Sequence, residues 1–225
     1  MRRGLALGLG LIAGLTALLP ARLLLPAPLT ATAVSGSVWQ AELTGAALGR
    51  MHLGDTAAAL QPGALLRGRL QWDVLGAVTG AVTGAVTGQI WRGFTAGGVA
   101  GLNGRVNGSP LPGLPLAGVN LADVMATLDG GGRCEAAGGQ VTADLALPLA
   151  GQRQLAGAPR CDGAALLLPL ASGDGRVRLE LTSNAGRWTA RLVISGAAPG
   201  EAAALAAGGF RAEAGVLVKE ETGTW

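Results

Sequence analysis

The sequence predicts a mainly β protein, in which a single N-terminal transmembrane helix precedes an antiparallel, twisted and curled β-sheet with one or two short helices. Three observations predict this fold class. An uncharged apolar segment follows two arginines at the N-terminus, and apolar and polar residues alternate in many later segments. Glycine accounts for 39 of the 225 residues, whereas aromatic residues make up only 3%. Abundant glycine favours turns, and alternation is typical of a sheet with one buried face.

The first expected element is the apolar segment, which runs without a charge from residue 4 to residue 21, after Arg2 and Arg3. A segment of this length reaches the lower end of the range that crosses a bilayer core of about 30 Å. Positive charge before the segment predicts that the N-terminus is cytoplasmic. We therefore predict a cytoplasmic N-terminus at 1–3, a transmembrane anchor at 4–25, a linker at 26–33 and a periplasmic β-rich domain at 34–225.

A cleaved signal peptide is the alternative for this segment, because such peptides also begin with basic residues and an apolar stretch. The best small-x-small cleavage site, residues 31–33, lies well past the apolar segment, with Pro26 and Pro28 between them. We therefore favour the retained anchor. It would place the protein in a bacterial inner membrane, crossing it once, with the bulk of the chain in the periplasm.

Strands are expected where apolar and polar residues alternate between glycine, Asn-Gly or proline residues. Asn184 to Gly186 is expected to form a hairpin turn, and Asn107-Gly108 a tight turn. The pair Asn103-Gly104 is compatible either with a turn or with a bulge inside a strand. The segments with this alternation are 33–43, 65–74, 101–108, 139–147, 176–182 and 187–194.

Two segments have helical features instead. Residues 121–128 follow Asn120, a candidate N-cap, and carry apolar residues at helical spacing. Residues 199–208 begin with proline and end with glycine, which is the usual asymmetry of a helix. We expect both segments to be brief helices next to the sheet.

The segment GAVTGAVTGAVTGQ, residues 76–89, repeats a four-residue unit three times. A second membrane helix is a poor interpretation, because the segment is short and rich in glycine and threonine. As a strand it would place Val78, Val82 and Val86 on one face together with the glycines. We predict a strand or a long hairpin arm whose registers, four residues apart, are nearly equivalent. A plain flexible loop is the alternative.

Two cysteines, Cys134 and Cys161, are present. An even number of cysteines in an exported chain predicts a disulfide, because the compartment beyond the membrane is oxidising. Two buried free thiols are the alternative. A metal site is disfavoured, since the single histidine, His52, is distant and the spacing does not match that of zinc ligands.

The residue pattern favours a protein that is not an enzyme and that needs no cofactor. His52 is the only histidine, and no nucleophile elbow lies near it. Aspartates are spread singly along the chain, and the glycines at 130–132 lack the lysine and serine or threonine of a phosphate loop. The net charge of +3 comes from scattered arginines without a basic cluster, which disfavours nucleic-acid binding.

Several short motifs follow one another in a characteristic order. Gly36, Ser37, Val38 and Trp39 come soon after the apolar segment, and the later motifs are residues 70–74, the segment from Cys134 to Cys161, and residues 186–188. In this order the chain resembles the type II secretion system protein N family, although Ser37 stands where that family usually has threonine. The resemblance implies an inner-membrane accessory component that contacts other components, the inner-membrane platform or the secretin. It implies no catalytic or cofactor-binding residues, and the oligomeric state is not predicted.

A second function is compatible with a curled sheet that has one apolar face. Such a sheet could serve as a periplasmic lipid-transfer or chaperone-like groove. The inward-facing side chains would then line an open trough, whereas in the favoured interpretation they form a closed core. The residues on which this choice depends are Val141, Leu145, Leu147, Leu179, Leu181, Leu192 and Ile194.

Overall fold

The computed structural model describes residues 29–37, 39–48, 51–78, 83–109, 111, 113–147 and 151–224. The predicted cytoplasmic N-terminus, the anchor at 4–25 and the first part of the linker lie outside the described residues. Among the residues that are described, no helix has the length and apolar character needed to cross a membrane.

The described chain forms one sheet of sixteen strands with two short helices, which confirms the prediction of a mainly β, antiparallel fold. The strands of the N-terminal half are β1 (Leu29–Thr30), β2 (Ala33–Ser37), β3 (Gln40–Leu48), β4 (Met51–Leu60), β5 (Leu70–Val78), β6 (Thr83–Arg92), β7 (Ala96–Asn107) and β8 (Leu116–Asp129). Those of the C-terminal half are β9 (Cys134–Leu147), β10 (Gly151–Gly157), β11 (Arg160–Asp162), β12 (Ala165–Ser172), β13 (Val177–Asn184), β14 (Arg187–Ser195), β15 (Arg211–Glu213) and β16 (Val216–Thr224). The helices are α2 (Pro62–Leu65) and α3 (Pro199–Ala207).

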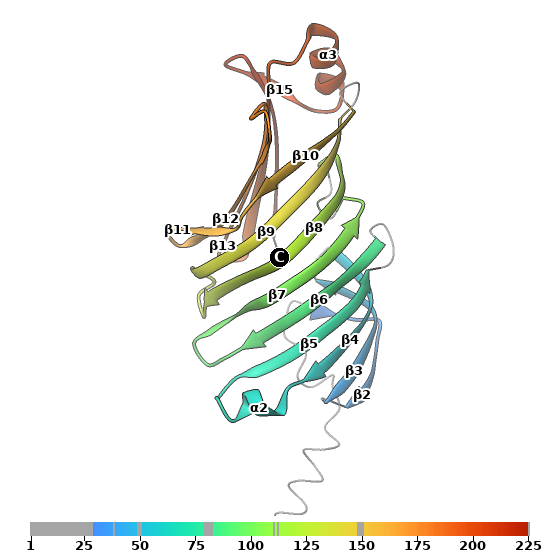
Figure 1. The fold of residues 1–225 in the computed structure, drawn as a ribbon, viewed down its shortest axis with the longest axis vertical. Coiled ribbons are helices and arrows are strands. Elements are labelled where there is room, and N and C mark those ends of the chain that lie inside the picture. The colour runs from blue at the N-terminus through green and yellow to red at the C-terminus, as the bar shows by residue number, and fades with distance from the viewer. Residues whose placement is uncertain are drawn as a thin grey trace, which may run out of the picture.

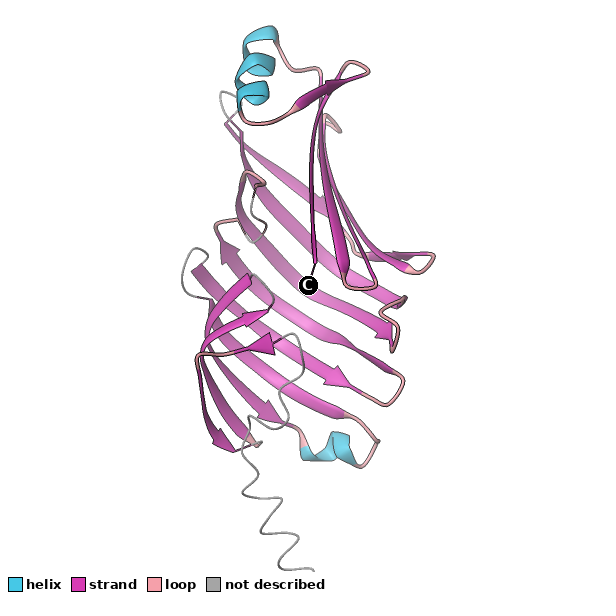
Figure 2. Ribbon diagram, turned by 180° about the vertical axis from the view of Figure 1, so that it is seen from behind, coloured by secondary structure: helices cyan, strands magenta, loops and turns pink. Residues whose placement is uncertain are grey.

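Most strands pair with their neighbours in sequence, so the sheet is built largely from consecutive hairpins (Figure 1). Its order runs from β1 through β3 to β10, then through β12, β13, β14 and β16 to β15, while β2 pairs with β3 and β11 with β12. The sheet is open. Seen from behind, both ends of the sheet turn toward the same side (Figure 2).

Bulges accompany this curvature. Register shifts interrupt the pairing of β3 with β4, β6 with β7, β7 with β8, and β8 with β9. An extra residue on one strand bends that strand and increases its local twist, so repeated bulges favour a curled sheet over a flat one. We call the face that carries the core the inner face and the opposite face the outer face.

The core fills the inner face of the C-terminal half. On β14, Trp188, Ala190, Leu192 and Ile194 are buried, while the residues between them are more exposed. The alternation of apolar and polar side chains thus gives the sheet one buried face and one solvent-exposed face. Leu205 of α3 is only 1% exposed and joins the same cluster, so this helix packs against the core at its end of the sheet.

The residues proposed to line a core or a trough are part of this cluster. Val141, Leu145, Leu147, Leu179, Leu192 and Ile194 are buried in it, and Leu181 is partly buried against it. These residues therefore form a closed core, as favoured from the sequence, and they do not line an accessible trough.

The helix expected at 121–128 is wrong, because these residues belong to the long strand β8. A register shift lies between Ala122 and Met125, where Asp123 has a φ of 50°. The extra residue changes which face each later side chain occupies, so Leu121 and Val124 both pack against the core. A bulged strand therefore reproduced the three-residue spacing of a helix. The helix expected at 199–208 is confirmed as α3.

Two expected strands have different bounds in the structure. Residues 33–43 are not one strand but a hairpin, in which β2 ends at Ser37 and β3 begins at Gln40. In the segment 65–74 the strand begins only at Leu70, after α2 and a short loop. The remaining segments with alternation match β7, β9, β13 and β14, except that Gly108 and Arg176 each lie one residue outside β7 and β13.

The repeat forms parts of two paired strands, which confirms the hairpin interpretation. Gly76 to Val78 end β5 and pair with residues 84–86 at the start of β6, so that Gly76 lies opposite Val86. Residues 79–82 lie outside the described residues. A Cβ on Gly84 would collide with the carbonyl oxygen of Arg105 in β7, so the glycine allows the close approach of these two backbones.

The structure also tests the hairpin turn expected at Asn184 to Gly186 and the two alternatives at Asn103-Gly104. Asn184 ends β13 and Arg187 begins β14, with positive φ at Ala185 and Gly186, as a tight hairpin requires. Asn103 and Gly104 lie inside β7, beside a register shift with β8, which confirms the bulge as the correct alternative.

A pH effect is expected at Asp174, in the turn between β12 and β13. The Ser172 hydroxyl donates a hydrogen bond of 2.5 Å to its carboxylate, the Arg176 N–H donates one of 3.1 Å, and Arg153 lies 3.2 Å away. These interactions, the hydroxyl first, hold the pKa of Asp174 below its ordinary value of 3.8. Their stabilising effect is therefore complete above pH 3.8 and is lost as the pH falls through the lowered pKa. An NMR titration should give a midpoint below 3.8, and Ser172→Ala should raise it. An unchanged midpoint in the variant would contradict the assigned cause.

Candidate functional site

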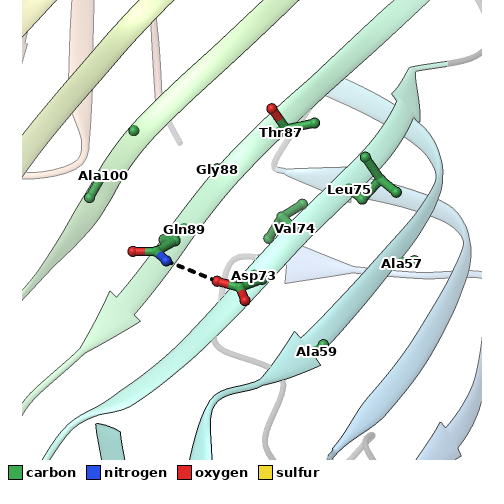
Figure 3. Close-up of a pocket in the computed structure, with 10 residues that line it drawn as sticks. Ala57, Ala59, Asp73, Val74, Leu75, Thr87, Gly88, Gln89 and Ala100 are labelled. Carbon is green, nitrogen blue, oxygen red and sulfur yellow. Dashed lines mark hydrogen bonds between the residues drawn. The ribbon is translucent and has the colours of Figure 1, made fainter. Parts of the chain in front are cut away.

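A hollow of about 690 Å³ lies on the outer face of β4 to β7 (Figure 3). Its position follows from the pairing register. Leu60 and Thr56 are buried on the inner face, so Ala57 and Ala59, which alternate with them, face outward. The side chains that line the hollow are Ala57, Ala59, Asp73, Val74, Leu75, Thr87, Gln89 and Ala100.

Small residues and a bulge explain why the surface is hollowed here. Ala57, Ala59 and Ala100 project only a methyl group, and Gly88 and Gly101 project none. A register shift between Thr87 and Gln89 brings β6 and β7 close together, so a Cβ on Gly88 would lie 2.9 Å from the Cα of Leu102. The floor of the hollow is therefore backbone, and larger side chains stand around it.

The carboxylate of Asp73 is held by two amides. Gln89 Nε2 donates a 3.0 Å hydrogen bond to Asp73 Oδ1, and Gln61 Nε2 donates to Oδ2. The amide of Gln61 comes from the loop before α2, so this contact ties the loop to the hollow. Both carboxylate oxygens already accept a hydrogen bond, which suits a fixed acceptor better than a general base.

Leu75 is the large apolar side chain of the hollow, and it is 64% exposed. The Thr87 hydroxyl donates to the carbonyl oxygen of Asn103 at 3.3 Å. Within the described ranges, no group of three His, Cys, Asp or Glu residues could hold a metal ion. The arrangement offers an apolar, shallow surface with one fixed acceptor, and such a surface can bind another protein.

The short motif at Gly36 to Trp39 lies at the hairpin between β2 and β3. Gly36 has a φ of 88°, and a Cβ there would collide with the carbonyl oxygen of Gln40. Val38 lies outside the described residues. The Trp39 carbonyl accepts a 3.2 Å hydrogen bond from the N–H of Leu60, which joins this hairpin to the end of β4. The motif thus has a structural position next to the α2 loop.

Cys134 and Cys161 form the predicted disulfide, with an S–S distance of 2.03 Å and Cα atoms 5.5 Å apart. The bond joins the start of β9 to β11, which otherwise pairs with β12. It therefore fastens the short strand β11 to the main sheet at a distance from the hollow.

Sequence reasoning missed the hollow and two exposed apolar side chains in turns. Leu66, after α2, is 92% exposed, and Phe94, between β6 and β7, is 96% exposed. A signal was present for Phe94, which follows glycine between two alternating segments and is one of only two phenylalanines. No sequence signal marked the hollow, because it depends on which strands pair.

A family model for protein N of the type II secretion system matches residues 27–218. This match covers most of the chain. The chain belongs to the type II secretion system protein N family. No curated protein and no solved structure matches it.

Membership confirms the resemblance drawn from the short motifs. Protein N is a component of a secretion system and not a member of a known enzyme family. Such a component works together with the other components of its system. The hollow, with its satisfied carboxylate and exposed leucine, is compatible with that kind of role.

Proposed function

We propose that this protein is a non-enzymatic accessory component of the type II secretion system, which supports export of folded proteins across the outer membrane. In this proposal residues 4–25 anchor the chain in the inner membrane and the sheet lies in the periplasm. The observation that carries the proposal is the family match over residues 27–218. The disulfide supports a periplasmic position, because disulfides persist in oxidising compartments.

The proposed role of the sheet is to contact another component of the system, in the inner-membrane platform or the secretin. The hollow on the outer face supports this role, since Leu75 exposes 64% of its surface there beside small side chains. An exposed leucine next to a shallow hollow can fit a complementary side chain of a partner.

Deleting the gene is expected to reduce the export of folded substrates, and the native chain should restore it. A chain with Leu75→Asp should restore export poorly, because a carboxylate at the contact would have to be buried without a partner. The amount of secreted substrate in the culture medium measures both effects.

Met125→Asp is the matched control. Met125 is also an apolar residue on an outer strand surface, in β8, and is 46% exposed, but it does not line the hollow. Both variants should melt at the temperature of the native chain, and the Met125 variant should restore export. Unchanged export after deletion, together with altered outer-membrane lipids, would refute the secretion role and favour a lipid carrier. Equal restoration by the two variants would refute the hollow as the contact.

A further inference from the structure

Two neighbouring turns expose large apolar side chains at one end of the sheet. Leu65 and Leu66, at the end of α2, are 40% and 92% exposed, and Phe94, between β6 and β7, is 96% exposed. We call these three residues the apolar tip. The two turns touch, because a Cβ on Gly68 would lie 3.3 Å from Cε2 of Phe94. The label α2 marks the position of the tip beside the turn between β6 and β7 (Figure 1).

Cationic side chains surround the apolar tip. Residues 61–69 and 90–95 contain Arg67, Arg69 and Arg92 but no aspartate or glutamate. The Arg69 guanidinium lies 5.4 Å from the ring centroid of Trp91, which holds this cation beside an aromatic side chain at the same end.

Two carboxylates near this end of the sheet, Asp73 and Asp129, offset only part of this positive charge, because the arginines outnumber them. Asp73 accepts hydrogen bonds from the two glutamine amides described above. Asp129, in the adjoining turn, accepts from the backbone N–H groups of Gly131 and Arg133 at 2.9 and 2.8 Å. The side chain of Arg133 adds a further cation at this end of the sheet.

We propose that the apolar tip docks on a bilayer surface that contains anionic phospholipids. Exposed leucine and phenylalanine side chains can enter the boundary between headgroups and acyl chains, while arginines around them attract anionic headgroups. Tryptophan is also typical of this boundary. Charge complementarity therefore favours an anionic bilayer.

The size of the tip argues against a protein as its occupant. A stable protein interface buries about 800 Å² on each partner, which needs many more side chains than three at a protruding turn. A bilayer accepts single protruding side chains, because its surface adapts to them.

The test uses the full chain with Thr95→Cys, labelled with the environment-sensitive fluorophore NBD. Thr95 is exposed and lies next to Phe94, and the disulfide leaves the new thiol as the reactive one among the described residues. The protein is reconstituted into nanodiscs of phosphatidylglycerol or of phosphatidylcholine. We expect a blue shift and a gain in NBD emission in phosphatidylglycerol relative to phosphatidylcholine, and loss of this gain in high salt.

Two variants separate the apolar and the cationic contributions. The double change Leu66→Ser and Phe94→Ser should abolish the blue shift of NBD emission in both lipids. Arg67→Glu should abolish only the difference in NBD emission between the two lipids. Because all these residues are exposed, the melting temperature should stay unchanged. The same label on Met125→Cys should show no lipid dependence.

Equal emission in the two lipids would overturn the proposal, as would a shift that persists in the serine variant. A shift that appears only with membranes containing the assembled secretion system would also overturn it and would assign the tip to a protein. The measurement needs no secretion activity, so its outcome is independent of the proposed secretion role.

Discussion

A chain in which both Cys134 and Cys161 are replaced by serine is expected to lose about 3.5 kcal/mol of its free energy of unfolding. The two cysteines are 27 residues apart in sequence. Their bond closes a loop that includes most of β9 to β11, and it reduces the number of conformations available to the unfolded chain. Urea unfolding of the native chain and of the double variant measures the difference.

Reduction of the native chain provides the matched control. Its unfolding curve in reductant should lie close to that of the double variant, and reductant should leave the double variant unchanged. Cys134 is only 8% exposed, so a small packing loss should accompany the serine substitution. If reductant does not move the unfolding midpoint of the native chain, the loop-closure argument is wrong for this disulfide.

Alternation was sufficient to predict the strands whose two faces differ most. From Val141 to Leu147 of β9 and along β14, every second residue is buried in the core and the intervening residues are more exposed, and the predicted segments 139–147 and 187–194 contain these residues. The disulfide was also predictable. The chain has two cysteines and was expected to lie in an oxidising compartment, so these two residues could form only one bond with each other. These features depend on local chemistry that the sequence carries by itself.

Features that depend on strand pairing were not predictable in this way. The bulge at Asp123 places Leu121 and Val124 on one face, so their spacing resembled that of a helix. Sequence alone does not show where the pairing of two strands shifts its register. The outer hollow combines Ala57 of β4 with Thr87 of β6 and Ala100 of β7. These residues have no common sequence signal, and only the order of the strands brings them together.

Two of the short motifs that supported the resemblance lie near one another in space, which periodicity could not reveal. Trp39 accepts a hydrogen bond from Leu60, and Leu60 lies opposite Trp72 in the pairing of β4 with β5. Two separate motifs, residues 36–39 and 70–74, therefore lie on either side of the end of β4. This arrangement gives both motifs a shared structural role beside the α2 loop.

Leu192→Ala is expected to lower the free energy of unfolding by about 3 kcal/mol, within the range for leucine truncation in a packed core. Leu192 is 0% exposed and belongs to the core cluster of the C-terminal half. Truncation removes the favourable transfer of three side-chain carbons from water into the core. It also leaves a cavity that the rigid neighbouring strands close only partly. Urea unfolding measures the loss, and the variant should keep the β-sheet circular dichroism of the native chain.

Leu75→Ala is the matched control, because the same atoms are removed from a side chain that is 64% exposed. Its cost should stay within about 0.5 kcal/mol. The comparison also distinguishes a closed core from a groove. If the inner face around Leu192 admitted water or a lipid, truncation there would enlarge a space that is already filled by mobile molecules. Its cost would then approach that of the Leu75 control, and a closed core in this half of the sheet would be refuted.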